Sequence, residues 1–183
     1  MIKFKIKNCR FLFIIFMLTL FIEFNNAFGE TIDIYPGDSF ETSAESLKPG
    51  DNLILHEGIY TDSGRISISV KGIENAPVII KAAENEARPL ITRLNSAPLQ
   101  NTINIEGSSY LTIKGLEISG NGGDGINLNS NPSYITLEDL EIHEVDVGIN
   151  FRSSMDHISV RRNHIYHTGI NNGTGEGMYV GCN

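Results

Sequence analysis

The chain has 183 residues, and its 14 Lys and Arg residues are outnumbered by 22 Asp and Glu, for a net charge of −8. Residues 1–29 hold four of the basic groups and one of the acidic groups, so residues 30–183 carry ten basic groups, 21 acidic groups and a net charge of −11. This charge argues against nucleic acid and anionic lipid as partners, and against a polyanionic ligand unless a local basic patch or a bound cation assists. The two cysteines, Cys9 and Cys182, fall on either side of residue 29, which excludes an intramolecular disulfide within residues 30–183.

The N-terminal segment, residues 1–29, has the pattern of a secretory signal peptide. Residues 1–10 carry four positive charges, Phe11–Ile22 is a continuous apolar run, and Ala27 and Gly29 place small residues at the −3 and −1 positions of a cleavage site. The alternative is an uncleaved membrane anchor, but this run is too short to span a bilayer of about 30 Å. We therefore expect cleavage after Gly29, one domain over residues 30–183, no stable membrane span after cleavage, and a secreted or periplasmic protein.

The mature chain begins with a short strand and a helical turn. Thr31–Tyr35 is expected to form the strand. Ser39–Leu47 is expected to form one or two helical turns with Phe40, Ala44 and Leu47 on one face. Such a segment would cap a repeat structure whose end otherwise exposes unpaired backbone.

Short apolar segments with period-2 alternation follow, and Gly, Asn, Ser and Asp separate them, which predicts strands joined by turns. These segments are Leu53–Leu55, Ile66–Val70, Val78–Ile80, Ile103–Ile105, Leu111–Ile118, Ile126–Ile142, Ile149–Ile165 and Met178–Val180. The stretch Ala82–Asn101, with Pro89 and Pro98, is the least regular, and we expect a looped-out turn there.

The last third of the chain repeats itself. Tyr110–Ser133, Tyr134–His157 and Ile158–Asn183 align almost without gaps, and the nearly constant period lengthens only in the loop of the last unit. Three positions recur in every unit, and their occupants are Ile113, Leu137 and Val160; Ile118, Ile142 and Ile165; and Gly125, Gly148 and Gly177. No segment between the strands has extended helical spacing, so we predict an all-β, right-handed parallel β-helix solenoid.

These coils, together with Pro49–Ile91, resemble the secreted right-handed β-helix proteins, or pectate-lyase-like superfamily. The segments PGDNLILHEGIYTD, RISISVKGIENAPVIIKA and RPLI look like the first coils of chondroitinase- and alginate-lyase-type members. The resemblance covers residues 31–183 and implies the fold. It does not specify an activity, because this fold carries lyases, hydrolases, epimerases, adhesins and phage spikes.

The sequence ends shortly after a core strand, without a polar cap. A solenoid end of this kind leaves a strand edge open. One expectation is that the chain lacks C-terminal coils of a longer protein; the other is a short complete protein whose edge is covered by a partner or by self-association. Cys182 lies at this end, as a packed residue of the last coil or as an unpaired thiol.

Stacking of the coils predicts which outward side chains meet. Lys114, Glu138 and Arg161 should form a structural ladder of alternating charge. On the strand that follows each repeated Gly, a polar column is expected to point outward, with further polar side chains beside it, and the resemblance implies that one such sheet face forms a sugar-binding groove. Its residues are Asn127, Asn150 and Tyr179, flanked by Arg152, Asp124 and Glu176. The alternative is an ordinary solvated face with an Asn ladder.

A second cluster joins His143, Glu144, Tyr166 and His167. Stacking should place His143 beside Tyr166, and Glu144 beside His167, which suits general acid/base work or a bound cation; polar surface is the alternative. Asp124, Asp146 and Glu176 could supply oxygens to calcium, a cofactor that the resemblance also suggests, although no calcium motif of fixed spacing is present.

Neither catalytic pattern of the resembled enzymes is complete in the sequence. A lyase needs a cationic base and neutralisation of the uronate carboxylate, and Arg152 is the one basic group placed on the candidate groove. A hydrolase needs paired carboxylates, and Asp124 and Glu176 are two coils, or about 10 Å, apart. Two hypotheses remain: the N-terminal part of a polysaccharide lyase or hydrolase, and a non-catalytic glycan-binding or adhesin-like scaffold.

Overall fold

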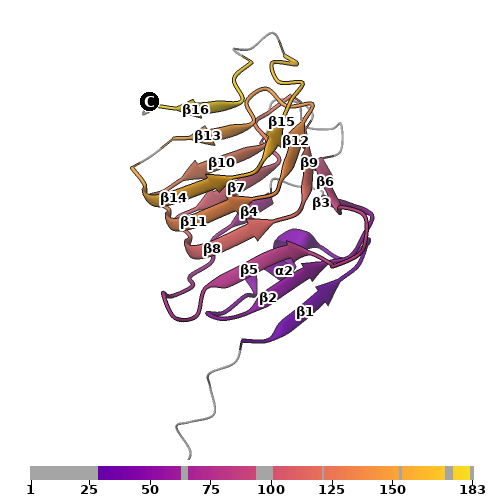
Figure 1. Cartoon of the computed structure of the whole chain (residues 1–183), viewed down its shortest axis with the longest axis vertical. Coiled ribbons are helices and arrows are strands. Elements are labelled where there is room, and N and C mark those ends of the chain that lie inside the picture. The colour runs from indigo at the N-terminus through magenta and orange to yellow at the C-terminus, as the bar shows by residue number, and fades with distance from the viewer. Residues whose placement is uncertain are drawn as a thin grey trace, which may run out of the picture.

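The computed structural model describes residues 29–62, 66–93, 101–120, 122–152, 154–171 and 175–181. The predicted signal peptide, apart from Gly29, and Cys182 lie outside these residues. In the described part the chain winds as a coil whose rungs stack from β1 to β16 (Figure 1).

The strands form three sheets in which every neighbouring pair runs parallel. The first sheet has the order β1 (Thr31–Ile34), β2 (Asn52–Leu55), β5 (Val78–Ala82), β8 (Ser109–Lys114), β11 (Ser133–Glu138) and β14 (Asp156–Arg161). The second has the order β3 (Ile59–Asp62), β6 (Leu90–Arg93), β9 (Glu117–Ser119), β12 (Glu141–His143) and β15 (His164–Ile165). The third has the order β4 (Ile66–Ile68), β7 (Ile103–Glu106), β10 (Ile126–Asn129), β13 (Ile149–Phe151) and β16 (Met178–Val180).

The core is a set of aligned apolar columns, one or more per sheet. In the first sheet Ile113 pairs with Leu137, which pairs with Val160, and in the second Ile118 pairs with Ile142, which pairs with Ile165. The recurring glycines also share one slot, because the amides of Ile126 and Ile149 donate to the carbonyls of Gly148 and Gly177. The predicted alignment is therefore confirmed, and the fold is an all-β parallel β-helix.

The predicted N-terminal cap is confirmed, although it is shorter than expected. Helix α2 spans Phe40–Glu45, and the Ser39 hydroxyl at its N-cap accepts from the amide of Thr42. Phe40, Ala44 and Leu47 are buried, as their shared face predicts. The helix covers the end of the coil at β3 and β4, where a Glu41 carboxylate oxygen accepts from the Ser67 amide at 2.8 Å.

The prediction of one looped-out turn over Ala82–Asn101 is wrong in its middle, where β6 (Leu90–Arg93) forms a regular rung of the second sheet. Pro89 obscured this strand in the sequence. A proline can stand just before a strand, because it lacks the amide that would donate to the neighbouring strand but keeps a carbonyl that can accept. Its carbonyl accepts from the Glu117 amide of the next rung.

Candidate functional site

The outer face of the third sheet carries the predicted polar column. Strand register aligns Asn104, Asn127, Asn150 and Tyr179, so the predicted partners do share one column. The column is not the open strip that a groove would need, because Asn127 and Asn150 are only 6% and 4% exposed. Of the predicted column, Tyr179 on the last strand is the member that is substantially exposed.

Hydrogen bonds between neighbouring amides satisfy part of this buried column. The Asn127 amide donates to Asn104 Oδ1 at 3.1 Å, and Asn101, just before β7, donates to the same oxygen at 2.9 Å. The side-chain carbonyl oxygens of Asn127 and Asn150 accept no hydrogen bond from the part of the chain that is described. A buried acceptor without a donor is costly, so these two oxygens are the places on this face where a donor group would be stabilising.

Asp124, Asn150 and Arg152 form the most structured polar group at the edge of this face. Asp124 is buried, its Oδ2 accepts from Asn150 Nδ2 at 2.8 Å, and Arg152 Nη2 lies 3.6 Å from the same oxygen. Burial raises the pKa of Asp124, while the Asn150 hydrogen bond and the Arg152 charge act in the opposite direction. The Arg152 side chain is 45% exposed, so it neutralises the buried carboxylate and still presents donors to solvent.

Glu176 belongs to the same edge two rungs further on. The Gly125 amide donates to Val147 and the Gly148 amide donates to Glu176, which places Asp124, Val147 and Glu176 at equivalent positions. The predicted two-rung separation is thereby confirmed, with buried Val147 between the two carboxylate-bearing residues. These two acids do not form a directly contacting pair.

The histidine cluster assembles as predicted, with two pairs that are joined by an edge-on contact between the rings of Tyr166 and His167 at 5.0 Å. The rings of His143 and Tyr166 stack at 5.0 Å, and His167 Nδ1 lies 2.9 Å from Glu144 Oε1. His143 Nε2 also lies 2.9 Å from Glu117, and the Tyr166 hydroxyl donates to Glu141 at 2.8 Å. This hydrogen bond raises the pKa of Tyr166, so the phenol stays protonated and acts as a donor.

The suggested calcium site does not fit the residues present. Asp124 is the best-placed carboxylate, but one of its oxygens already accepts from Asn150 and lies beside the Arg152 guanidinium, where a divalent cation would be repelled. No three His, Cys, Asp or Glu side chains within the described ranges converge closely enough to hold a metal ion.

The charge ladder of the first sheet is confirmed in its register and in the pair of Glu138 with Arg161, and differs from the prediction at Lys114. Glu138 is in register with Lys114 and Arg161, but its two carboxylate oxygens bind Arg161 (2.6 Å) and Arg162 instead of Lys114. The reason is local: Arg162 has a left-handed backbone (φ 53°), which turns its side chain back toward Glu138 and Asp139.

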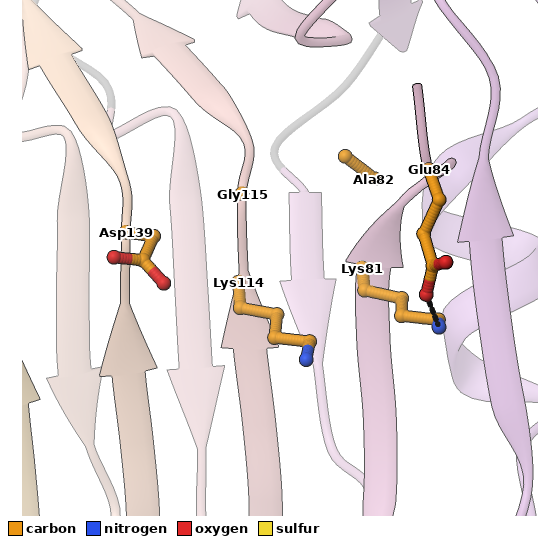
Figure 2. A pocket seen from close by; sticks show the side chains of 6 residues that line it. All are labelled: Lys81, Ala82, Glu84, Lys114, Gly115 and Asp139. Carbon is orange, nitrogen blue, oxygen red and sulfur yellow. Dashed lines mark hydrogen bonds and ion pairs between the residues drawn. The ribbon is translucent and has the colours of Figure 1, made fainter. Parts of the chain in front are cut away.

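Sequence reasoning missed a pocket beside this ladder. An open pocket of about 200 Å³ lies at the corner between the first and second sheets, and its lining is Lys81, Ala82, Glu84, Lys114, Gly115 and Asp139 (Figure 2). Lys81 and Lys114 pair directly across β5 and β8. Aligning Val78–Ile80 with Leu111–Ile113 in the sequence would have revealed this pairing.

None of the helices in the described segments is both long enough and apolar enough to cross a membrane. None of the curated proteins compared with the chain matches it.

Three of the solved structures with similar folds are named as two polysaccharide lyases and a lacto-N-biosidase. An alginate lyase from Paenibacillus sp. str. FPU-7 superposes with a TM-score of 0.74 and 27% identity, over 83% of this chain and 50% of that one. Pectate lyase Pel9A superposes with a TM-score of 0.67 and 18% identity, over 77% of this chain and 40% of that one. The GH136 lacto-N-biosidase from Eubacterium ramulus superposes with a TM-score of 0.57 and 17% identity, over 73% of this chain and 34% of that one.

This chain therefore spans half the length of the alginate lyase and less of the other two. The two more distant enzymes share the fold only. A family model described as the right-handed β-helix region matches residues 79–183, which is more than half of the chain. Together with three parallel sheets stacked in register, this match means that the chain belongs to the right-handed β-helix family, within the pectate-lyase-like superfamily.

Proposed function

We propose that the protein binds a polysaccharide at the edge of the third sheet, around Arg152, and that it forms part of a polysaccharide lyase or hydrolase. The family fold and the likeness to an alginate lyase at 27% identity support a glycan as the ligand. The observation that carries the proposal is the group of Asp124, Asn150 and Arg152, in which a half-exposed guanidinium is fixed by a buried carboxylate.

A guanidinium held in this way suits a sugar ligand. Its orientation is set before binding, so less side-chain entropy is lost when it donates to a hydroxyl or a uronate carboxylate. Tyr179, on the strand after β13, offers a partly exposed ring on the same face, and aromatic rings pack well against sugars. Secretion, with residue 30 as the first residue, is part of the proposal; the intact mass of the protein from its native source tests it.

A non-catalytic glycan-binding scaffold is the second candidate, and one observation favours it. Among the described residues on the outer face of the third sheet, Arg152 is the one cationic side chain, and it is engaged with Asp124. A lyase requires a base as well as neutralisation of the uronate carboxylate, so the described residues of this face supply at most one of these two functions.

The test compares binding of an oligomer of mannuronate and an oligomer of galacturonate to the parent protein, to Arg152→Gln and to Lys48→Gln. Lys48 precedes β2, and its replacement removes the same charge on another part of the surface. We expect Arg152→Gln to weaken binding about tenfold, as for loss of a charged hydrogen bond, and Lys48→Gln to have little effect. Equal affinity of all three proteins would refute a site around Arg152.

An activity measurement on the same samples separates the two candidates. Elimination by a lyase produces an unsaturated sugar with strong ultraviolet absorption, whereas hydrolysis produces reducing ends without it. Either product would support the enzyme hypothesis. Retained binding without either product would support the scaffold hypothesis.

A further inference from the structure

Two lysines lie directly opposite each other on the outer face of the first sheet. Lys81 of β5 is in register with Lys114 of β8, on adjacent rungs about 4.8 Å apart. Like charges placed opposite each other destabilise a sheet. The next two rungs carry Glu138 and Arg161 in the same column, so the repulsive pair is confined to one place.

Among the described residues, the carboxylate that acts electrostatically on Lys114 is Asp139, which it shares with Arg162 and Arg88. The neighbour of Lys114 in the column, Glu138, gives both carboxylate oxygens to Arg161 and Arg162. Within the same part of the chain the Lys114 ammonium makes no hydrogen bond and no ion pair within 4 Å, and Figure 2 shows its side chain extending toward the strand of Lys81. Lys81 has a partner in Glu84, but this pair is long, at 3.4 Å, and Glu84 is 82% exposed, so it is weak.

The two lysines line a space rather than a packed surface. Ala82 and Gly115 occupy the positions next to them, and both residues are small. Gly115 has φ 74°, and a Cβ there would lie 3.3 Å from the Ala82 side chain, so a larger residue would narrow the pocket. The pocket of about 200 Å³ stays open because of these two residues.

Two acids line the pocket: Glu84 pairs with Lys81, and Asp139 is neutralised by arginines outside the pocket lining. Arg162 binds both carboxylate oxygens of Asp139, at 2.8 and 3.0 Å, and this interaction lowers the pKa of Asp139. Arg88 donates to the main-chain carbonyl of the same residue and adds a further positive charge nearby. The pocket is thus locally positive, although residues 30–183 carry a net charge of −11.

We propose that the pocket between Lys81 and Lys114 binds the carboxylate of an acidic polysaccharide, as a contact site separate from Arg152. Two ammonium groups on adjacent rungs can each donate to one carboxylate oxygen, which would replace their mutual repulsion with two charge-assisted hydrogen bonds. The acidic protein repels polyanions in general, so a local basic site is where a uronate chain would be held. This inference rests on the proposed function, because it takes a glycan as the ligand.

The experiment measures binding of a mannuronate oligomer by calorimetry to the parent protein and to Lys81→Gln, Lys114→Gln and Lys48→Gln. A neutral glucan oligomer of the same length and sulfate alone serve as the other probes. We expect each pocket substitution to weaken mannuronate binding about three- to fivefold, the scale of an exposed ion pair, and the Lys48 control to change little. The neutral oligomer should respond to none of these changes, and added salt should weaken mannuronate binding.

Other outcomes would overturn the inference in distinguishable ways. Unchanged affinity of the pocket variants, with weakened binding of Arg152→Gln, would refute the pocket and leave the proposed function standing. Absence of mannuronate binding to the parent protein would refute both. Sulfate binding in a Lys114-dependent manner and as tightly as the oligomer would mean a free-anion site instead of a glycan site. Both substitutions remove a like-charge contact, so circular dichroism should show a folded protein in each case.

Discussion

At the residue scale, a glycine precedes each of the last three strands of the third sheet, β10, β13 and β16, and the rung above decides how much space it has. A Cβ at Gly148 would lie 2.3 Å from the carbonyl oxygen of Gly177 and 2.5 Å from the Ile165 side chain. At Gly177, the equivalent position on the last described rung, the nearest atom would be 3.9 Å away. The same slot therefore excludes a side chain in one rung and tolerates it in the next.

This contrast predicts different effects of the same substitution. Gly148→Ala should lower the free energy of unfolding by about 1–3 kcal/mol, because the added methyl group overlaps main-chain atoms that cannot move aside. Gly177→Ala, the matched control, should change it by less than about 0.5 kcal/mol. Urea unfolding followed by circular dichroism measures both. Similar losses in the two variants would contradict the close approach of the rungs.

At the element scale, the register of the strands was predictable and the surroundings of their outer faces were not. The nearly constant period of the repeat determined which side chains share a column, as in the pairing of Asn127 with Asn150. Burial of that column depends on chain segments outside the strands, such as Asn101, whose position no periodicity specifies. The pairing of Lys81 with Lys114 was not predicted for a related reason. The stretch of chain between these two residues is longer than one period of the repeat.

His56 joins the first elements of the coil. Its Nε2 lies 3.1 Å from Asp33 of β1, its Nδ1 lies 2.9 Å from Glu86 after β5, and its ring stacks on Tyr35 at 4.2 Å. The hydrogen bond to Glu86, followed by that to Asp33, raises the pKa of His56 above 6.5. A protonated ring between two carboxylates therefore stabilises the contact of three rungs.

The pH dependence of this contact follows from the direction of the shift. Because the folded-state pKa of His56 is raised, its contribution to stability is fully present below about pH 6.5 and is lost as the pH rises through the raised pKa. The thermal midpoint of the parent protein should fall over this range more steeply than that of His56→Gln. Parallel profiles for the two proteins, measured by scanning calorimetry, would show that the bridge contributes nothing.

At the scale of the whole molecule, the two ends of the third sheet differ in how they are covered. At the first strand, β4, Ile66 and Ile68 are fully buried, and Glu41 of α2 accepts the hydrogen bond of the Ser67 amide. At the last strand, β16, Met178 is 53% exposed and Val180 is 80% exposed. Among the strands of the described residues, β16 pairs with β13 alone. In a solenoid each rung is stabilised by its neighbours, so the two ends should differ in local stability.

Hydrogen exchange of the protein of residues 30–183 should reveal this difference. We expect the amides after His167, including those of β16, to exchange faster than the amides of the other strands. Opening this rung breaks its pairing with β13 only and exposes little additional apolar surface. The amides of β4 provide the internal control: they also lie at an edge of the third sheet, but the α2 cap should keep them protected. Uniform protection through Val180, equal to that of β4, would show that an uncovered last rung does not fray, and that neighbour contacts on one side suffice to hold it.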